Sequence, residues 1–353
     1  MSGGFADQLR ELERKRRSKL ASKLPSWAEF DIEVPDSLNF QQCSSEVTAR
    51  YKASLAGESL RVADLTGGLG ADAWAFSLCS QAVWYNERNP ALCACVERNF
   101  ASMGIKNVAF NKFEISPEAT DWKQVLKGFA PDLIYLDPAR RDASGKKIFL
   151  LEECSPDVLS LMPLLLEMAP KVMVKVSPMA DLTMLRRRLE GVLSALHVVG
   201  ADGECKEILC LCSKRPSGEP RVVLYENGHS FSGTYAREET PGEEKLLFVP
   251  SAALTKSGLG PEISVRAFDE ELAHFGKFFR IVEDIPFSSS AIKTLGRRYP
   301  QAEVTAKGVR VSSDELRRRM GLRPGGRIHI FACAICSERR LIVCSTLTAP
   351  AGA

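Results

Sequence analysis

Short apolar runs alternate with amphipathic stretches between residues 61 and 176. The runs that predict buried β-strands are Arg61–Leu65, Ala82–Asn86, Asn107–Lys112, Asp132–Leu136 and Lys171–Val176. The stretches between them predict helices at Ala71–Cys79, Pro90–Met103, Asp121–Lys127 and Pro156–Glu167. Strands that alternate with helices in this way favour an α/β fold with a parallel, doubly wound sheet.

The next two strands follow a different pattern. The segments "ALHVVG" and "KEILCLCS" are joined by the tight polar turn "ADGE", which predicts an antiparallel hairpin. A parallel α/β sheet that ends in such a hairpin is the architecture of the class I methyltransferases, whereas an NAD-binding domain normally ends in another parallel strand. We therefore predict a Rossmann-like, seven-stranded sheet with a terminal antiparallel hairpin.

The segments on either side of this block predict additional parts. Residues 1–24 predict a charged helix that Pro25 closes, and "SSEVTARYKASLA" predicts a second helix before the first strand. The polar stretch "SKRPSGEP" predicts a linker after the hairpin. Beyond it we predict a small α+β region with helices at Asp269–Phe275 and Ser313–Met320 and strands at Arg221–Glu226, Leu246–Val249, Val309–Val311, Ile328–Ala334 and Leu341–Cys344.

Composition and charge are those of an ordinary globular protein with more than one domain. The chain has 353 residues, of which 45% are hydrophobic and 26% are charged. Its net charge of +3 is too small to indicate a nucleic-acid partner by itself. Basic runs such as Arg317–Arg319 can form phosphate-binding patches, although each taken alone is more often a solvated helix face.

The cysteine pattern favours reduced thiols in a cytoplasmic protein without a structural metal. The eleven cysteines follow no small-scaffold spacing, and the polar N-terminus does not resemble a signal peptide. No apolar run approaches the roughly 20 residues that span a bilayer, so we expect no membrane partner. Cys333 and Cys336 have zinc-like spacing, but no second pair or histidine accompanies them, and alternation in "IHIFACAICS" predicts a core strand instead.

A glycine-rich turn follows the first predicted strand in "RVADLTGGLG". Glycines at this place let the backbone turn tightly and approach a ligand, and the helix that follows offers free amide donors. Glu87 ends the second strand, where it can accept two hydrogen bonds from a ribose diol. This arrangement serves both NAD and S-adenosylmethionine, and Gly68, Gly70 and Ala73 also satisfy the dinucleotide pattern, so the glycines alone leave both open.

Three features favour S-adenosylmethionine as the cofactor. Asp64 precedes the turn, where a methionine amino group and a sulfonium benefit from a carboxylate; the hairpin is the second feature. The third is the end of the fourth strand, Asp137-Pro138-Ala139-Arg140, which resembles the acceptor-side motif of many nucleic-acid methyltransferases. Including an adenine contact from the segment "FNKFE", the predicted cofactor-binding residues are Asp64, Thr66, Gly67, Gly68, Gly70, Glu87, Glu114 and Asp137.

Several motifs together resemble one protein family. They are "QCSSEVTARYKA", "DLTGGLGADAWAF", "YNERNP", "YLDPARRD", "VKVSPMADL", "ECKEILCL", "FVPSAALTKSG" and "AKGVRVSSDELRRRMGLRPGGRIHIFACAI", and they cover roughly residues 40–345. They resemble a family of uncharacterised bacterial class I S-adenosylmethionine-dependent methyltransferases in which a ferredoxin-like segment and a THUMP-like domain follow the catalytic domain.

The resemblance implies a domain division and a class of substrate. The expected parts are an N-terminal helical segment at residues 1–44, a methyltransferase domain at 45–214, a ferredoxin-like segment at 221–290 and a THUMP-like domain at 291–346. Because THUMP domains are associated with tRNA-modifying enzymes, the resemblance implies a structured RNA partner, with tRNA as the expected class.

A ribose 2′-hydroxyl is one candidate acceptor of the methyl group. Enzymes of that class resemble one another in a Lys-Asp-Lys-Glu tetrad, and Lys52, Asp137, Lys175 and Glu207 occur here in that order and in matching elements. Lys175 would serve as the base if burial and its neighbours lower its pKa, and the other three would orient it. The competing interpretation makes Lys52 a surface helix residue and Glu207 a strand-edge charge.

Other acceptors and other classes of protein stay open. An exocyclic amine of a nucleobase, in RNA or DNA, would be held at Asp137, with Arg140 stacking on the base or binding a phosphate in place of the usual aromatic ring. Carbon 5 of a pyrimidine is disfavoured because no cysteine follows the fifth strand. A non-catalytic RNA-binding protein and, last, an NAD-dependent oxidoreductase complete the alternatives.

Overall fold

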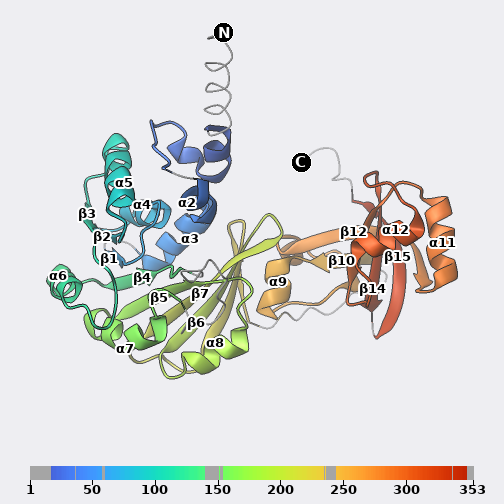
Figure 1. Ribbon diagram of the computed structural model, residues 1–353. Coiled ribbons are helices and arrows are strands. Elements are labelled where there is room, and N and C mark those ends of the chain that lie inside the picture. The colour runs from blue at the N-terminus through green and yellow to red at the C-terminus, as the bar shows by residue number, and fades with distance from the viewer. Residues whose placement is uncertain are drawn as a thin grey trace, which may run out of the picture. The chain divides into compact units, whose positions relative to one another are not determined.

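The first sheet has the strand order of a class I methyltransferase. Its first seven strands are β1 (Arg61–Asp64), β2 (Ala82–Asn86), β3 (Val108–Asn111), β4 (Leu133–Leu136), β5 (Lys171–Val176), β6 (Leu193–Ala201) and β7 (Glu204–Ser213). They lie in the order β3-β2-β1-β4-β5-β7-β6 (Figure 1). Neighbours from β3 to β5 run parallel, and β7 pairs antiparallel with β5. The predicted fold class is therefore confirmed.

The computed structural model divides the chain into two compact units, residues 1–201 with 206–223 and residues 202–205 with 224–353. It describes residues 17–35, 37–57, 60–139, 151, 154–233, 235, 244–335 and 337–347. In this part of the chain, no helix is long and apolar enough to cross a membrane.

Two strands that the sequence analysis did not assign to this sheet extend it beyond β6. They are β8 (Arg221–Glu226) and β9 (His229–Ser232), which makes the sheet nine-stranded where seven strands were predicted. Asn227 and Gly228 join them, and both have positive φ angles, of 48° and 93°. Such a pair is the preferred connection of a two-residue hairpin. The segment "SKRPSGEP" therefore connects two strands of one sheet.

Four of the seven α-helices in the described part of the first unit begin at a side-chain cap. They are α2 (Ser37–Gln42), α3 (Glu46–Ala56), α4 (Ala71–Ser77), α5 (Pro90–Ser102), α6 (Asp121–Phe129), α7 (Val158–Met168) and α8 (Leu182–Arg188), with a 3₁₀ turn at Pro25–Trp27. Ser45, Asn89, Asp157 and Asp181 cap α3, α5, α7 and α8 by accepting backbone N–H bonds. Apolar side chains of α6, α7 and α8 pack on the face of the sheet that carries Ile134, Leu136, Val172 and Val174.

The opposite face of the central strands carries polar side chains. Asp64 in β1 pairs with Tyr135 in β4, and Tyr135 pairs with Met173 in β5. Because side chains alternate between the two faces of a strand, Lys175 lies on the same face as Tyr135. Lys175 pairs with Leu209, two residues from Glu207, so that the β7 carboxylate is on this face as well.

The described part of the N-terminal segment packs on the first unit. The Trp27 side chain is fully buried, and its ring meets Trp74 of α4 and Phe100 of α5 edge to face, at 6.0 and 6.5 Å between ring centroids. Glu33 is held by Arg98, with 2.6 Å between Arg98 Nη2 and Glu33 Oε2. The described part of the predicted 1–44 segment, residues 17–35 and 37–44, thus belongs to the same unit as the glycine turn. Residues 1–16 and residue 36 lie outside the described residues.

The second unit contains a six-stranded sheet. Its strands are β10 (Leu246–Pro250), β11 (Ser264–Arg266), β12 (Gly276–Pro286), β13 (Glu303–Lys307), β14 (Ile328–Ile335) and β15 (Glu338–Thr346), in the order β11-β10-β12-β15-β14-β13. Its helices are α9 (Ala252–Ser257), α10 (Glu270–Ala273), α11 (Ser289–Arg298) and α12 (Ser313–Met320). Leu295 and Leu316 from α11 and α12 share one buried cluster with Ile330 and Val343 of the sheet.

Two details of this unit differ from the sequence analysis. The strand predicted at Val309–Val311 is wrong: β13 ends at Lys307, because Gly308 turns the chain with a φ of 72°. The boundary predicted between the ferredoxin-like segment and the THUMP-like domain, after residue 290, falls inside α11. In addition, β12 on one side of this boundary pairs with β15 on the other. Cys333 is buried in β14, as expected of a core strand, whereas Cys336 lies outside the described residues.

Candidate active site

The glycine turn between β1 and α4 is fixed by contacts that exclude larger residues. A Cβ atom on Gly67 would lie 2.0 Å from Tyr85 Cε2, and one on Gly70 would lie 2.7 Å from Val96 Cγ1. Gly70 also has a positive φ of 84°. The Tyr85 hydroxyl donates to the Gly68 carbonyl at 2.7 Å, so the turn is bonded to β2. The three glycines are needed for packing and backbone conformation at this turn.

Asp64 is a buried carboxyl group with one unused oxygen. Its Oδ1 accepts the Thr66 N–H at 3.0 Å, whereas its Oδ2 is buried and has no partner among the described residues. Burial first, and then the charge of Asp72, raise the pKa of Asp64 well above its usual range. A buried oxygen without a donor is costly, so this position suits a ligand that brings a positively charged N–H group.

Thr66 and Glu87 connect the turn to the neighbouring strands. The Thr66 hydroxyl accepts the Asp137 N–H at 2.6 Å, which ties the end of β1 to the end of β4. Glu87 follows β2 and is half-buried. Its two carboxylate oxygens accept backbone N–H bonds from Gly68 at 3.1 Å and from Asn89 at 2.8 Å. Glu87 is thus held beside the turn, where it can accept further bonds from ligand hydroxyls.

Glu114 is exposed and lies in the loop after β3. Asn86, which the sequence analysis did not single out, holds this loop: its amide donates to the Phe113 carbonyl at 3.0 Å and accepts the Phe113 N–H at 2.8 Å. The Phe113 ring stacks on Trp84, with 6.1 Å between ring centroids and 5° between planes. The loop thereby has a defined conformation next to the end of β2.

Lys52 is fully buried, which excludes the interpretation of a surface helix residue. Its ammonium group lies 2.7 Å from Glu207 Oε1 and 3.0 Å from Asp72 Oδ1. It also donates to Ser44 Oγ at 2.7 Å. Lys52 thus donates hydrogen bonds to Glu207 and Ser44 and forms an ion pair with Asp72.

Lys175 lies between the buried Glu207 and the more exposed Asp137. Its Nζ lies 2.5 Å from Asp137 Oδ2 and 3.9 Å from Glu207 Oε2. The Asp137 side chain is 27% exposed, compared with 8% for Lys175 and 4% for Glu207. The structure therefore brings Lys52, Asp137, Lys175 and Glu207 into one cluster whose accessible member is Asp137.

The condition under which Lys175 would serve as the base, a lowered pKa, is not met in this structure. Burial by itself would lower the pKa, but the carboxylates of Asp137, Glu207 and Asp72 outweigh burial and raise it. Lys175 is therefore held as an ammonium ion. A role as general base from this state would require the loss of a proton that three carboxylates retain.

Three further residues complete the cluster, and none was found from the sequence. Asp72 in the first turn of α4 accepts the hydroxyls of Ser44 and Tyr135 on Oδ2, at 2.9 and 2.8 Å. Burial by itself would raise the pKa of Asp72, but the ammonium groups of Lys52 and Lys175 outweigh it and lower the pKa. The sequence signal was weak, because an acidic residue in a first helical turn is common for its interaction with the helix dipole alone.

Two other findings delimit the site. Arg140, predicted to contact the acceptor, lies outside the described residues. In the part of the chain that the structure describes, no group of three or more metal-ligating side chains could hold an ion.

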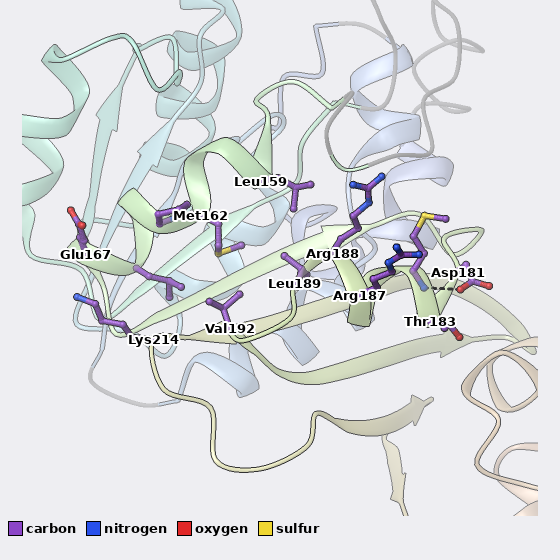
Figure 2. A pocket seen from close by; sticks show the side chains of 13 residues that line it. Leu159, Met162, Glu167, Asp181, Thr183, Arg187, Arg188, Leu189, Val192 and Lys214 are labelled. Atoms are coloured by element: carbon purple, nitrogen blue, oxygen red, sulfur yellow. Dashed lines mark hydrogen bonds between the residues drawn. The ribbon is translucent and has the colours of Figure 1, made fainter.

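A cavity of about 940 Å³ between α7 and α8 is separate from this site. Figure 2 shows Met162, Leu189 and Val192 along its middle, with Arg187 near one end and Lys214 near the other. The residues lining it are Leu159, Met162, Pro163, Leu166, Glu167, Asp181, Thr183, Met184, Arg187, Arg188, Leu189, Val192 and Lys214, and no predicted site residue is among them.

Comparisons with known proteins agree with this architecture. The family description "THUMP domain-like" matches residues 276–346, which begins at β12, ahead of the boundary expected at residue 291. A curated relative from Mycobacterium tuberculosis, named as an uncharacterised S-adenosylmethionine-dependent methyltransferase, is 23% identical over 308 residues, covering 80% of this chain and 79% of the relative. Proteins from two strains of that organism match equally.

A solved structure aligns with nearly the whole chain. A methyltransferase candidate from Porphyromonas gingivalis W83 superimposes with a TM-score of 0.79 at 28% sequence identity, covering 95% of this chain and 89% of that protein. The present chain thus combines a class I methyltransferase fold with a THUMP-like domain at its C-terminal end.

Proposed function

We propose that this protein is an S-adenosylmethionine-dependent methyltransferase that acts on RNA, expected to be tRNA, at a ribose 2′-hydroxyl. Three observations support methyl transfer from S-adenosylmethionine: the fold, the glycine turn and the names of the relatives. The observation that carries the choice of acceptor is the single cluster formed by Lys52, Asp137, Lys175 and Glu207. Two buried lysines among three carboxylates next to the end of β4 favour a functional cluster, because buried charges gather at functional sites more often than elsewhere.

The residues around the turn fit the cofactor. No described residue donates to Asp64 Oδ2, and the ammonium group of a methionine moiety would supply a donor. Glu87, oriented by two backbone amides, would accept the ribose hydroxyls, and the glycines leave room for the backbone to approach. When bound, S-adenosylmethionine supplies a methyl group activated by its sulfonium.

Asp137 and Lys175 have different roles at the acceptor. Asp137 is the accessible carboxylate, so it accepts the proton of the acceptor hydroxyl. This proton becomes strongly acidic as the oxygen gains a methyl group, and a carboxylate is then a sufficient base. Lys175 remains an ammonium ion beside Asp137, and its hydrogen bond holds the Asp137 carboxylate in position to accept that proton.

An RNA partner is supported by the second unit. THUMP-like domains are associated with RNA modification, and the match covers residues 276–346. The last turns of α11 and α12 in this unit carry Arg297 and Arg298, and Arg317, Arg318 and Arg319. Basic side chains at helix ends provide donors for phosphate oxygens.

The test uses methyl-labelled S-adenosylmethionine with total tRNA from cells that lack this gene, followed by alkaline hydrolysis of the RNA. Label in alkali-resistant dinucleotides is expected, because a 2′-O-methyl group blocks cleavage of the adjacent phosphodiester. Label in mononucleotides would contradict the ribose hydroxyl as acceptor and indicate a nucleobase amine held at Asp137. If no label is transferred to tRNA, tRNA is rejected as the substrate class.

Two variants connect the product to the cluster. Lys175→Met is expected to lower kcat by about 100-fold or more, the range of a lost or misplaced general base, because Asp137 would lose the partner that positions its carboxylate. Lys171→Met is the matched control, because Lys171 is the exposed first residue of the same strand. Equal losses in the two variants would contradict the proposed role of Lys175.

A further inference from the structure

The buried charges form a row with alternating signs. It runs Asp72, Lys52, Glu207, Lys175, Asp137, with separations of 3.0, 2.7, 3.9 and 2.5 Å between the paired nitrogen and oxygen atoms. The members come from α4, α3, β7, β5 and the end of β4. Only the last of them has a side chain as much as 27% exposed.

The inner half of this row does not reach the acceptor. The Lys52 side chain is 0% exposed, donates hydrogen bonds to Ser44 and Glu207 and forms an ion pair with Asp72. The Asp72 side chain is 9% exposed and is bonded to Ser44 and Tyr135 as well. Both side chains are buried, so any contribution of Asp72 to methyl transfer passes through neighbouring groups, chiefly Lys52 and Glu207.

We propose that Asp72 is a positioning residue of methyl transfer, which acts through Lys52 and Glu207 to fix the Lys175–Asp137 pair at the acceptor. The inference rests on the proposed function for the identity of the acceptor, and it adds a residue that the tetrad does not include. Asp72 also lies two residues after Gly70, the N-cap of α4, so it links the glycine turn to the acceptor cluster.

The bonds to Asp72 explain how this link is made rigid. Tyr135 donates to Asp72 from β4, two residues before Asp137. Ser44 donates to Asp72 and accepts from Lys52, and it directly precedes Ser45, the N-cap of α3. A shift of α4 would therefore move Lys52 and, through Glu207, change the position of Lys175.

Asp72 also sets the charge balance of the row. The row has two ammonium groups and three carboxylates, so neutralising Asp72 leaves equal numbers of each sign. Other ionisable groups that act on the row are Asp64, Tyr135, Cys43 and Lys23. Burial raises the pKa of Asp64, Tyr135 and Cys43, which favours their neutral forms, so Asp72 contributes a charge that these groups do not replace.

The test follows Lys175 by NMR in the full-length protein with ¹³Cε-labelled lysine, assigned by the signal lost in Lys175→Arg. In the wild-type chain the Lys175 signal is expected to titrate above those of exposed lysines. In Asp72→Asn it is expected to titrate about one pH unit or more lower than in the wild type, because a nearby negative charge is gone. Tyr135→Phe removes a hydrogen bond to Asp72 but no charge, and no such shift is expected.

Kinetics provide the second measurement. Asp72→Asn is expected to lower kcat at least about 10-fold while the Kd for S-adenosylmethionine changes less than about 3-fold. Asp121→Asn, an exposed first-turn aspartate of α6, is the matched control and is expected to match the wild type. An unshifted Lys175 signal in Asp72→Asn, or an equal shift in Tyr135→Phe, would overturn the proposal.

If Asp72→Asn alone does not fold, a charge-balanced double variant can be measured in its place. Lys52→Gln with Asp72→Asn removes one charge of each sign, so the Lys175 signal should return to its wild-type titration while kcat stays low. A wild-type kcat in this folded double variant would reject the positioning role. If no RNA accepts a methyl group but the Lys175 signal still shifts in Asp72→Asn, the proposed function fails while the coupling within the row is retained.

Discussion

Lys52 and Glu207 lie 155 residues apart in the sequence, yet Lys52 Nζ is 2.7 Å from Glu207 Oε1. Lys52 belongs to α3, which precedes the whole sheet, and Glu207 belongs to β7, the strand of the terminal hairpin that turns back beside β5. The contact therefore exists only when α3 and the β6–β7 hairpin are both in place. Assembly of the candidate site depends on completion of the sheet.

The stability of this contact is testable by removing the ammonium group. Lys52→Met would leave Glu207 and Asp72 buried without their shared partner, which costs about 3–5 kcal/mol in the free energy of unfolding. Lys127→Met, at an exposed position of α6, is the control and is expected to change it by less than about 0.5 kcal/mol. Urea denaturation of the two variants makes the comparison, and a loss in Lys52→Met no larger than in the control would contradict the buried pairing.

Asp64 is expected to lower the stability of the ligand-free protein at neutral pH and to strengthen binding of S-adenosylmethionine. Its pKa is raised in the folded protein, so its contribution to stability is present at low pH and is lost as pH rises through the folded pKa. Asp64→Asn removes this loss and is expected to stabilise the ligand-free protein by about 1 kcal/mol at neutral pH, a rise in Tm of about 2–4 °C. The same variant should bind S-adenosylmethionine at least about 10-fold more weakly. A lower Tm would refute the assigned protonation.

Proton release provides a check on Asp64 that needs no variant. If the methionine ammonium pairs with Asp64, binding favours the charged carboxylate, so affinity should rise with pH towards the pKa of the free protein and then level off. Calorimetric titration with S-adenosylmethionine in two buffers of different ionisation enthalpy measures the protons released. Binding without proton release at mildly acidic pH would show that Asp64 is not the partner of the ammonium.

The pH profile of methyl transfer separates two roles for Lys175. If Lys175 acts as an ammonium ion, its raised pKa keeps it charged, so kcat should stay level from neutral pH to about pH 10. If Lys175 were the base, kcat would increase about 10-fold per pH unit over the same range. The measurement is kcat against pH at saturating substrates, with stability checked at each pH.

The central strands were predictable because parallel strands that are covered on both faces are short apolar runs. The positions of Asp64, Thr66 and Glu87 followed, since the ends of such strands meet at one edge. β12 was missed because its apolar alternation is interrupted between Ile281 and Glu283, where the pairing with β15 shifts register. The Asn227-Gly228 turn was present as a hairpin signal but was not recognised.

The buried charges could be predicted in part only. Lys52 and Glu207 occur in the order of the tetrad, but their burial depends on partners that are distant in sequence. The pKa of Lys175 is set by how many carboxylates face it, and Asp72, the third of these, gives no signal beyond an acidic first helical turn. The direction of the pKa shift therefore required the structure.

The glycine turn packs closely against the Tyr85 ring at Gly67. In Gly67→Ala the new Cβ would lie 2.0 Å from the Tyr85 ring, so either the turn or β2 must move. We expect a loss of about 1–3 kcal/mol in the free energy of unfolding and weaker binding of S-adenosylmethionine. Gly128→Ala in α6 is the control: a Cβ there meets no atom within 4 Å, and alanine in a helix is favoured by about 0.5–1 kcal/mol. Opposite changes in Tm of the two variants are expected, and a stabilised Gly67→Ala that still binds cofactor would show that Tyr85 does not fix the turn.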